Sequence, residues 1–172
     1  MFDRFGEFDS CEELNQAAAV QKNGGDEEAL VALALENGID KEDAEDYIDG
    51  CVEILATPLM AAVGKLKVEA ADLDLKGVLV DWKDSVVEMC MQDKEMQMQV
   101  RKSGKLLRDC LASMLAFAFE NKVQVSDQVV KATTITNNGR KEPMRTPVYL
   151  GMPNKTEVRK LVMEYYTGDD KK

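Results

Sequence analysis

Apolar residues recur at every third or fourth position along most of this chain, and that spacing places them on one face of an α-helix. The segment from Leu75 to Met89 is typical, since its apolar stripe includes the single tryptophan, Trp82, and alternates with charged residues. Residues 106–119 are the most hydrophobic stretch, but charged residues interrupt it and it is too short to span a bilayer. This stretch therefore predicts a central buried helix.

Capping residues divide the helical pattern into separate helices. Ser10 and Glu13 have the spacing of a capping box, and Pro58 predicts either a kink or a new helix start. Glycines such as Gly38 and Gly104 predict helix ends. Together these signals predict about seven or eight helices, with N-terminal caps at Ser10, Asp26, Asp40, Asp93 and Ser126.

The pattern changes between residues 132 and 151, where Thr, Asn, Gly and Pro replace the apolar repeat. The Asn-Gly pair at 138–139 is a strong turn signal, so we expect a small β-hairpin whose strands are "TTIT" and "PVYLG". A last helix follows this region. The expected fold is a mainly α, single multi-helix domain over residues 1–168 with a minor hairpin, followed by a flexible tail at residues 169–172.

Charge is distributed unevenly along the chain. Residues 1–50 contain fifteen acidic and three basic residues, whereas residues 101–150 contain four acidic and nine basic ones. The chain therefore has an acidic half, residues 1–100, and a basic half, residues 101–168, within a net charge of −10. An acidic surface of this kind either keeps a protein soluble or steers it towards a positively charged partner.

The densest acidic stretch is "GIDKEDAEDYIDG", residues 38–50. A calcium-binding loop that began at Asp40 would need glycine where Glu45 stands and a bidentate glutamate where Cys51 stands, so this interpretation fails. Apolar residues at helical spacing instead predict a short acidic helix. Its carboxylates are either a solvated helix face or a surface that imitates a phosphate backbone and docks onto a basic partner. The partner-binding candidates are Asp40, Glu42, Asp43, Glu45, Asp46 and Asp49.

Basic residues form two candidate nucleic-acid-binding groups. The first lies around an expected helix–helix junction in "VRKSGKLLRD", where backbone amides at the start of the second helix would add to a phosphate-binding surface. The second lies on an expected loop in "NNGRKEPMR". Such contacts predict salt-sensitive binding to double-stranded DNA, while the alternative is an ordinary charged surface that pairs with the acidic half. The candidates are Arg101, Lys102, Lys105 and Arg108, with Arg140, Lys141 and Arg145.

The composition argues against an enzyme. The chain has no histidine, which excludes Ser–His and Cys–His nucleophile pairs and HExxH zinc sites, and its glycines do not form a phosphate-binding loop. The four cysteines are too widely spaced for a zinc module, so we expect reduced thiols and neither a metal nor another cofactor. The acidic N-terminal segment does not resemble a signal peptide, which predicts a cytoplasmic protein without a membrane partner.

Methionines cluster between residues 89 and 98. Packing in the core is one role for them, and the alternative is an adaptable surface contact, including a homodimer, because thioether side chains are flexible. The cluster consists of Met89, Met91, Met96 and Met98.

Segments spread over nearly the whole chain resemble a known protein family. These segments are "MFDRFGEFDSCEELN", "ENGIDKEDAEDYIDG", "DLKGVLVDWKD", "VRKSGKLL" and "LGMP…VRKLVMEYYTG", in this order. The family consists of small acidic proteins carried on mobile elements of gut bacteria, and its members are anti-CRISPR proteins that inhibit the RNA-guided nuclease of type II systems. The resemblance includes no catalytic motif and transfers no interface residue.

The resemblance implies a stoichiometric inhibitor without catalytic turnover, acting in the cytoplasm of a bacterial host cell. Its acidic helices would occupy the basic channel of the nuclease as a DNA mimic, and would block target DNA binding or cleavage. In the alternative arrangement, the basic half would hold the guide RNA or the target DNA within the complex. The other function that we consider is a DNA-binding accessory or regulatory protein of a mobile genetic element.

Overall fold

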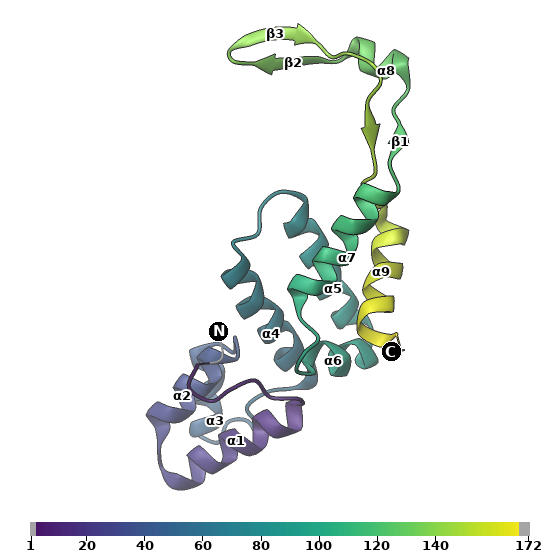
Figure 1. Cartoon of the computed structure of the whole chain (residues 1–172). Coiled ribbons are helices and arrows are strands. Elements are labelled where there is room, and N and C mark those ends of the chain that lie inside the picture. The colour runs from purple at the N-terminus through teal and green to yellow at the C-terminus, as the bar shows by residue number, and fades with distance from the viewer. Residues whose placement is uncertain (1–2, 169–172) are drawn as a thin grey trace.

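The computed structural model describes residues 3–168, and the expected tail at residues 169–172 lies outside this range. The described chain is mainly helical, with nine helices and two small antiparallel sheets (Figure 1). The predicted fold class, mainly α with a small hairpin, is confirmed, although the helices are more numerous than expected. The elements in chain order are α1 (Cys11–Gly24), α2 (Glu27–Glu36), α3 (Lys41–Ile48), α4 (Pro58–Leu73), α5 (Val78–Gln92), α6 (Lys94–Arg101), α7 (Leu107–Glu120), β1 (Val123–Gln124), α8 (Asp127–Ala132), β2 (Thr134–Asn137), β3 (Arg140–Pro143), β4 (Tyr149–Leu150) and α9 (Lys155–Thr167).

The first three helices form an N-terminal lobe, residues 3–56, around a hydrophobic cluster that also includes Ala61 from the start of α4 (Figure 1). Leu14 of α1, Leu30 of α2 and Tyr47 of α3 are all buried in this cluster. Phe8, from the segment before α1, packs against the same residues. The acidic first part of the chain therefore surrounds a small apolar core, with its charged side chains directed outwards.

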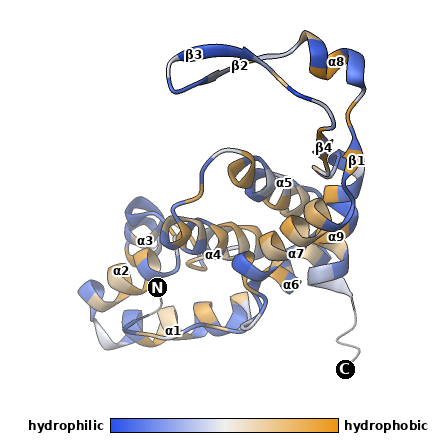
Figure 2. Cartoon of the chain, turned by 45° about the horizontal axis from the view of Figure 1, so that its top comes forward, coloured by the Kyte–Doolittle hydropathy of each residue, from blue (hydrophilic) through white to orange (hydrophobic). Residues whose placement is uncertain are grey.

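The other long helices form a helical body, residues 57–121 and 153–168, around a second hydrophobic cluster. Trp82 is buried in this cluster, as the apolar stripe of its segment predicted. The inward face of α7 is buried as well, but Leu115 and Phe119 on the same helix remain exposed. Figure 2 shows the apolar sides of the helices facing one another within each part. Across residues 3–168, the helices are too short or too polar to cross a membrane.

Helix starts follow the capping signals closely. Side-chain oxygens of Ser10, Asp26 and Asp93 accept hydrogen bonds from backbone amides in the first turns of α1, α2 and α6. α4 begins at Pro58, so this proline starts a new helix and does not kink one. Ser126 precedes α8 at the predicted position but makes no side-chain cap hydrogen bond.

A close backbone approach connects the lobe to the body. Gly38, which follows α2 with a φ of 71°, lies against Gly64 in α4. A Cβ atom on Gly64 would lie 2.3 Å from the carbonyl oxygen of Asn37, so only glycine fits this helical position. The corner between α2 and α3 is therefore seated directly on α4.

Residues 122–152 form an arm that extends away from the helical body (Figure 1). Its stalk is the short antiparallel ladder between β1 and β4, and its outer part consists of α8 and the β2–β3 ribbon. Val130 of α8 is buried, but nearly all other arm residues are exposed. Figure 2 shows that the ribbon is predominantly hydrophilic.

The predicted hairpin is present, but one of its expected strands is wrong. β2 pairs with the residues Arg140–Pro143, and the "PVYLG" segment pairs with β1 instead. Asn138 and Gly139 have φ angles of 49° and 78°, and two consecutive positive values are the geometry of a two-residue hairpin turn. Such a turn pairs the residues that flank it immediately, so the second strand begins at Arg140.

Candidate functional site

The six predicted acidic residues lie on α3 and at its two ends. Five are exposed, and Asp43 is half-buried. Asp40 stands at the predicted N-cap position of α3 without a side-chain cap hydrogen bond, and its carboxylate instead lies 2.7 Å from Lys67. Lys41 likewise lies 2.6 Å from Glu45. Because all four partners are exposed, water and salt screen these pairs, and the surface of α3 stays strongly negative.

Packing of α2 against α3 adds acidic residues that the sequence did not single out. A hollow of about 520 Å³ lies between the two helices and carries carboxylates from both. Glu27 and Glu28 stand in the first turn of α2, a position that acidic residues commonly occupy for helix stability alone. Only the tertiary structure places them opposite α3. The hollow is lined by Glu27, Glu28, Val31, Lys41, Glu45, Ile48 and Asp49.

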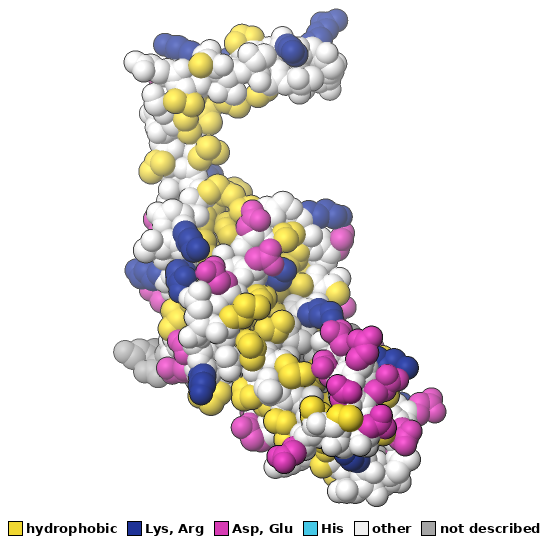
Figure 3. Space-filling view, turned by 180° about the vertical axis from the view of Figure 1, so that it is seen from behind, with side chains coloured by type: hydrophobic (Ala, Val, Ile, Leu, Met, Phe, Trp, Pro, Cys, Tyr) yellow, Lys and Arg dark blue, Asp and Glu magenta, His cyan; other side chains and the backbone are white. Residues whose placement is uncertain are grey.

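These side chains form an acidic lobe surface, which we define as the exposed carboxylates of α2, α3 and the ends of α3. Figure 3 shows Asp and Glu side chains gathered over the N-terminal lobe, at the end of the molecule opposite the arm. Within residues 3–168, no group of three or more Asp, Glu or Cys side chains is arranged to hold a metal ion. The arrangement can accept several arginine or lysine side chains of a partner at once.

The structure corrects one predicted nucleic-acid-binding residue. Arg101 is 1% exposed, and its Nη2 donates a hydrogen bond to Oδ1 of Asn37 at 2.7 Å. The ring of Phe8 lies 6.0 Å from the guanidinium carbon. Burial lowers the pKa of Arg101 from its ordinary value, and the nearby carboxylate of Glu7 opposes that shift. Arg101 therefore holds α6 against the N-terminal lobe and is not part of the surface.

A buried ionic cluster joins the same elements. Nζ of Lys65, which has no exposed side-chain area, lies 2.7 Å from Glu7 and 3.7 Å from Glu69. Burial raises the pKa of Glu69, while a hydrogen bond from the Leu107 amide and the charge of Lys65 lower it. Sequence reasoning missed this cluster because Lys65 and the exposed Lys67 look alike in the sequence. The one available signal was the Lys65–Glu69 spacing of four residues.

Two backbone amides at the start of α7, where the sequence predicted a contribution to phosphate binding, already have partners within the chain. The Leu106 amide donates to the hydroxyl of Tyr165 at 2.8 Å, and the Leu107 amide donates to Glu69 at 2.7 Å. Amides that are bonded internally do not bind an external anion. The amides of Leu106 and Leu107 are therefore not available for the predicted phosphate contact.

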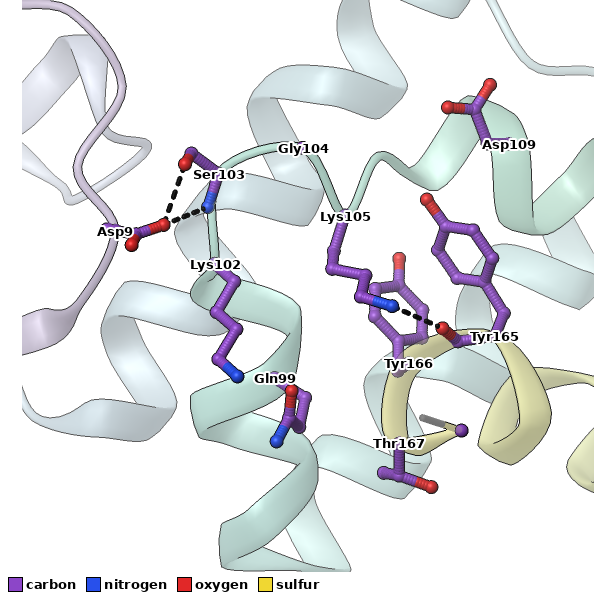
Figure 4. Close-up of a pocket in the computed structure, with 11 residues that line it drawn as sticks. Asp9, Gln99, Lys102, Ser103, Gly104, Lys105, Asp109, Tyr165, Tyr166 and Thr167 are labelled. Carbon is purple, nitrogen blue, oxygen red and sulfur yellow. Dashed lines mark hydrogen bonds between the residues drawn. The ribbon is translucent and has the colours of Figure 1, made fainter. Parts of the chain in front are cut away.

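Two of the junction cations line a hollow of about 720 Å³ that also contains acidic groups (Figure 4). Nζ of Lys105 donates to the carbonyl of Tyr165 at 3.1 Å, and Lys102 is exposed beside it. Across the hollow, Asp9 accepts hydrogen bonds from the amide and the hydroxyl of Ser103 at 2.8 and 2.7 Å. These two bonds lower the pKa of Asp9. The hollow thus presents both signs of charge.

Arg108, the fourth cation of the junction, lies apart from this hollow. Its Nε is 3.0 Å from the carboxylate of Asp109, and this hydrogen bond raises the pKa of Arg108. It lines a smaller hollow with Glu69 and Asp72. The four cations predicted around the junction therefore do not form one positive surface.

The remaining three predicted cations, Arg140, Lys141 and Arg145, are exposed on the arm. Arg140 and Lys141 are consecutive residues of β3, so their side chains project from opposite faces of the ribbon. The arm as a whole, residues 122–152, contains five basic and two acidic residues. Figure 3 shows Lys and Arg side chains along the outer part of the arm, which consists of α8 and the ribbon. The positive surface is thus carried by the arm and not by the whole basic half.

The methionine cluster is divided between core and surface. Met89 and Met96 are buried in the body, whereas Met91 and Met98 are 63% and 58% exposed. Core packing therefore accounts for two of the four residues.

Comparisons with protein-family models, with curated proteins and with solved structures found no match for this chain. The candidate site is accordingly defined by geometry: an acidic lobe surface at one end of an elongated helical molecule and a basic arm at the other (Figures 1 and 3).

Proposed function

We propose that this protein is a stoichiometric, non-catalytic inhibitor that binds a type II RNA-guided DNA nuclease through its acidic lobe surface. The observation that carries the proposal is the concentration of exposed carboxylates on two packed helices, α2 and α3, at one end of the molecule (Figure 3). The segments that resemble anti-CRISPR proteins support the same class of protein. In this class the protein blocks target DNA binding or cleavage without turning over a substrate.

The physical basis of the proposed inhibition is competition for positive charge. Such a nuclease holds its guide and target strands in a basic channel and reads a short duplex motif with arginines. Carboxylates on the acidic lobe surface offer those side chains the charge that they otherwise find on phosphates. Ala44 and Tyr47 of α3 are buried in the lobe core, so the carboxylates keep a fixed spacing. A rigid surface loses little conformational entropy on binding.

A cleavage titration tests the proposal directly. The nuclease is loaded with guide RNA, and increasing amounts of this protein are added before the target DNA. An inhibitor of this kind stops cutting when its molar amount approaches that of the nuclease, at any incubation time. An enzyme would instead act at trace amounts, and its effect would grow with time.

Charge-neutralising variants identify the surface that is responsible. Removal of three exposed carboxylates from α3 and its C-terminal end should raise the inhibitor concentration needed for half inhibition by about threefold to a hundredfold, because each exposed ion pair contributes about 0.2–1 kcal/mol. The matched control removes three exposed carboxylates from α5 and α6. The proposal fails if both triple variants inhibit equally well. The test variant combines Glu42→Gln, Asp46→Asn and Asp49→Asn, and the control combines Asp81→Asn, Asp84→Asn and Glu95→Gln.

A second candidate function, a DNA-binding accessory protein of a mobile element, is favoured by the β2–β3 ribbon. A two-stranded antiparallel ribbon fits the major groove of duplex DNA, and this one carries Arg140 and Lys141 on opposite faces. Fluorescence anisotropy with plain duplex DNA, in low and in moderate salt, separates the two functions. Tight, salt-sensitive binding to DNA without the nuclease supports the accessory role. If the protein alone does not bind DNA in this way, the inhibitor function is the better explanation.

A further inference from the structure

A small, partly apolar hollow lies between α3 and the segment that joins α3 to α4. Its volume is about 180 Å³, which corresponds to roughly six water molecules at about 30 Å³ each. This is below the range of pockets for cofactors and other small molecules, roughly 300–1,000 Å³, and it is the size of one long side chain. The α3–α4 hollow, as we call it, is lined by Asp43, Asp46, Val52, Ile54, Leu55, Thr57 and Met60.

The apolar wall of the hollow is exposed and is held in place beside α3. Val52 and Ile54 are 42% and 48% exposed, although both are residue types that are usually buried. Leu55 is only 2% exposed and packs in the core of the lobe. The backbone amides of Cys51 and Val52 donate hydrogen bonds to the carbonyl of Asp46 at 2.8 and 3.4 Å. These contacts fix the joining segment at the end of α3, so the wall keeps its position.

The two carboxylates that line the hollow have no partner within the described chain. Asp40 and Glu45 pair with lysines, but the side chains of Asp43 and Asp46 make no hydrogen bond or ion pair with any residue in 3–168. Asp43 is half-buried, so its carboxylate is less well hydrated than a fully exposed one. The two residues are three positions apart on α3, which makes them neighbours on its surface, with about 5–6 Å between their Cβ atoms.

We propose that the α3–α4 hollow receives one arginine side chain of the partner protein. The hydrocarbon stem of the arginine lies against Val52 and Ile54, and its guanidinium donates hydrogen bonds to the carboxylates of Asp43 and Asp46. Arginine fits this site better than lysine, because its planar guanidinium presents a fork of donors and is more weakly hydrated than an ammonium group. The identity of the partner as the nuclease rests on the proposed function, whereas the chemistry of the hollow does not.

Titration with an arginine probe tests the hollow without a nuclease. The isotope-labelled full chain is titrated with Nα-acetyl-arginine amide, and the backbone amide chemical shifts are followed by two-dimensional NMR. The shifts should saturate with a Kd of roughly 1 mM and should be largest within residues 43–60. Nα-acetyl-lysine amide carries the same charge and should bind at least about threefold more weakly. Shifts that spread evenly over α2 and α3, or equal affinities for the two probes, overturn the proposal.

Two variants separate this site from a general attraction between opposite charges. Asp43→Asn combined with Asp46→Asn should abolish the saturable shifts. Ile54→Ser changes no charge but removes part of the apolar wall, and it should weaken binding of the arginine probe by about threefold or more. Leu35→Ser is the matched control, because Leu35 is 53% exposed on α2 and does not line the hollow. The proposal is wrong if the Ile54→Ser and Leu35→Ser proteins bind the arginine probe equally tightly.

The cleavage titration then shows whether the arginine belongs to the nuclease. Ile54→Ser should raise the concentration needed for half inhibition by about fivefold or more, as expected for a central arginine contact, and Leu35→Ser by less than about twofold. If the wild type inhibits and Ile54→Ser inhibits equally well, the proposal is overturned and the inhibitor function stands. If the hollow binds the arginine probe but the wild type does not inhibit, the proposed function fails and the arginine site stands.

Discussion

The guanidinium of Arg101 donates a hydrogen bond to the side-chain oxygen of Asn37 across the contact between the two hydrophobic clusters, with 2.7 Å between Nη2 and Oδ1. Asn37 in turn donates from Nδ2 to the carbonyl of Leu33 at 2.9 Å. Both polar side chains are buried, so neither has water as an alternative partner. This contact makes the orientation of the N-terminal lobe, and hence of the acidic lobe surface, depend on α6.

Replacement of Arg101 should therefore affect stability and not surface chemistry. Arg101→Met leaves the side-chain oxygen of Asn37 without its buried donor and Glu7 with Lys65 as its remaining buried cation, and it should lower the free energy of unfolding by about 3 kcal/mol. Urea unfolding followed by the fluorescence of the single tryptophan, Trp82, measures the change. Lys102→Met removes the adjacent, exposed cation and should change the same quantity by less than about 0.5 kcal/mol. Equal effects of the two substitutions would show that Arg101 is not the structural residue that we describe.

Gly64 in α4 gives a second test of the contact between lobe and body. Alanine is favoured over glycine in a helix by about 1 kcal/mol, so propensity alone predicts that Gly64→Ala is stabilising. A Cβ atom there would lie 2.3 Å from the Asn37 carbonyl oxygen, and such overpacking costs about 1–3 kcal/mol or more. We expect the clash to prevail and the melting temperature to fall.

Gly24 at the end of α1 is the control for this substitution. Apart from its chain neighbours and the adjacent backbone of α1, no described atom lies within 4 Å of the Cβ position at Gly24, so Gly24→Ala should be neutral or slightly stabilising. Thermal unfolding followed by circular dichroism compares the two variants. A Gly64→Ala protein as stable as the wild type would mean that the end of α2 does not approach α4 closely.

Glu69 should make stability depend on pH. Burial raises its pKa above the ordinary value of 4.5, and the Leu107 amide and Lys65 only partly offset this. A carboxyl group with a raised pKa binds its proton more tightly in the folded chain, so its contribution is complete below the unfolded pKa and is lost as pH rises through the folded pKa. The stability of wild type minus that of Glu69→Gln should therefore fall as pH rises from about 4 towards neutrality.

Urea titrations at a series of pH values measure this difference. Glu95→Gln, which removes an exposed carboxylate from α6, controls for the loss of one negative charge. A difference between wild type and Glu69→Gln that grows with pH would contradict the expected sign, and would mean that the folded chain lowers the pKa of Glu69.

The thiols should differ sharply in reactivity. Burial raises the pKa values of Cys90 and Cys110 to about 12 each, so at pH 8 roughly one in ten thousand of these thiols is ionised. Burial raises the pKa of Cys11 as well, whereas Cys51 is exposed. An aromatic disulfide reagent should react quickly with one thiol per folded chain and with the others only after denaturation. Cys51→Ser should abolish the fast reaction, and its persistence would contradict the assignment.

The sequence predicted the helix starts and the hairpin turn, because these features are determined by interactions between neighbouring residues. Ser10 and Asp26 cap helices because a side-chain oxygen reaches an amide two or three residues away, and Pro58 begins α4 because its ring tolerates only a first-turn position. The Asn-Gly pair at 138–139 predicted a turn for the same reason. These features depend on a few neighbouring residues and can be predicted without knowledge of the tertiary structure.

Features that depend on packing were not predictable in this way. Arg101 and Lys102 are adjacent and similar in the sequence, but the contact of α6 with α4 buries the first and exposes the second. The stalk was missed because its strands are two residues long and join segments that lie far apart in the chain. To predict that the arm alone carries the positive surface, one would need to know both that α6 packs against α4 and that β1 pairs with β4.

The arm cations should control any affinity for duplex DNA. Each phosphate contact adds about 0.9 to the slope of log affinity against log salt concentration, so loss of two contacts should reduce that slope by about 2. The double variant Arg140→Gln and Lys141→Gln removes two exposed cations from β3, while Lys102→Gln and Arg108→Gln removes two from the junction. Anisotropy titrations across a salt series should show the decrease for the arm variant and an unchanged slope for the junction variant. A decrease in the junction variant alone would mean that DNA contacts the body, where acidic side chains lie beside the cations.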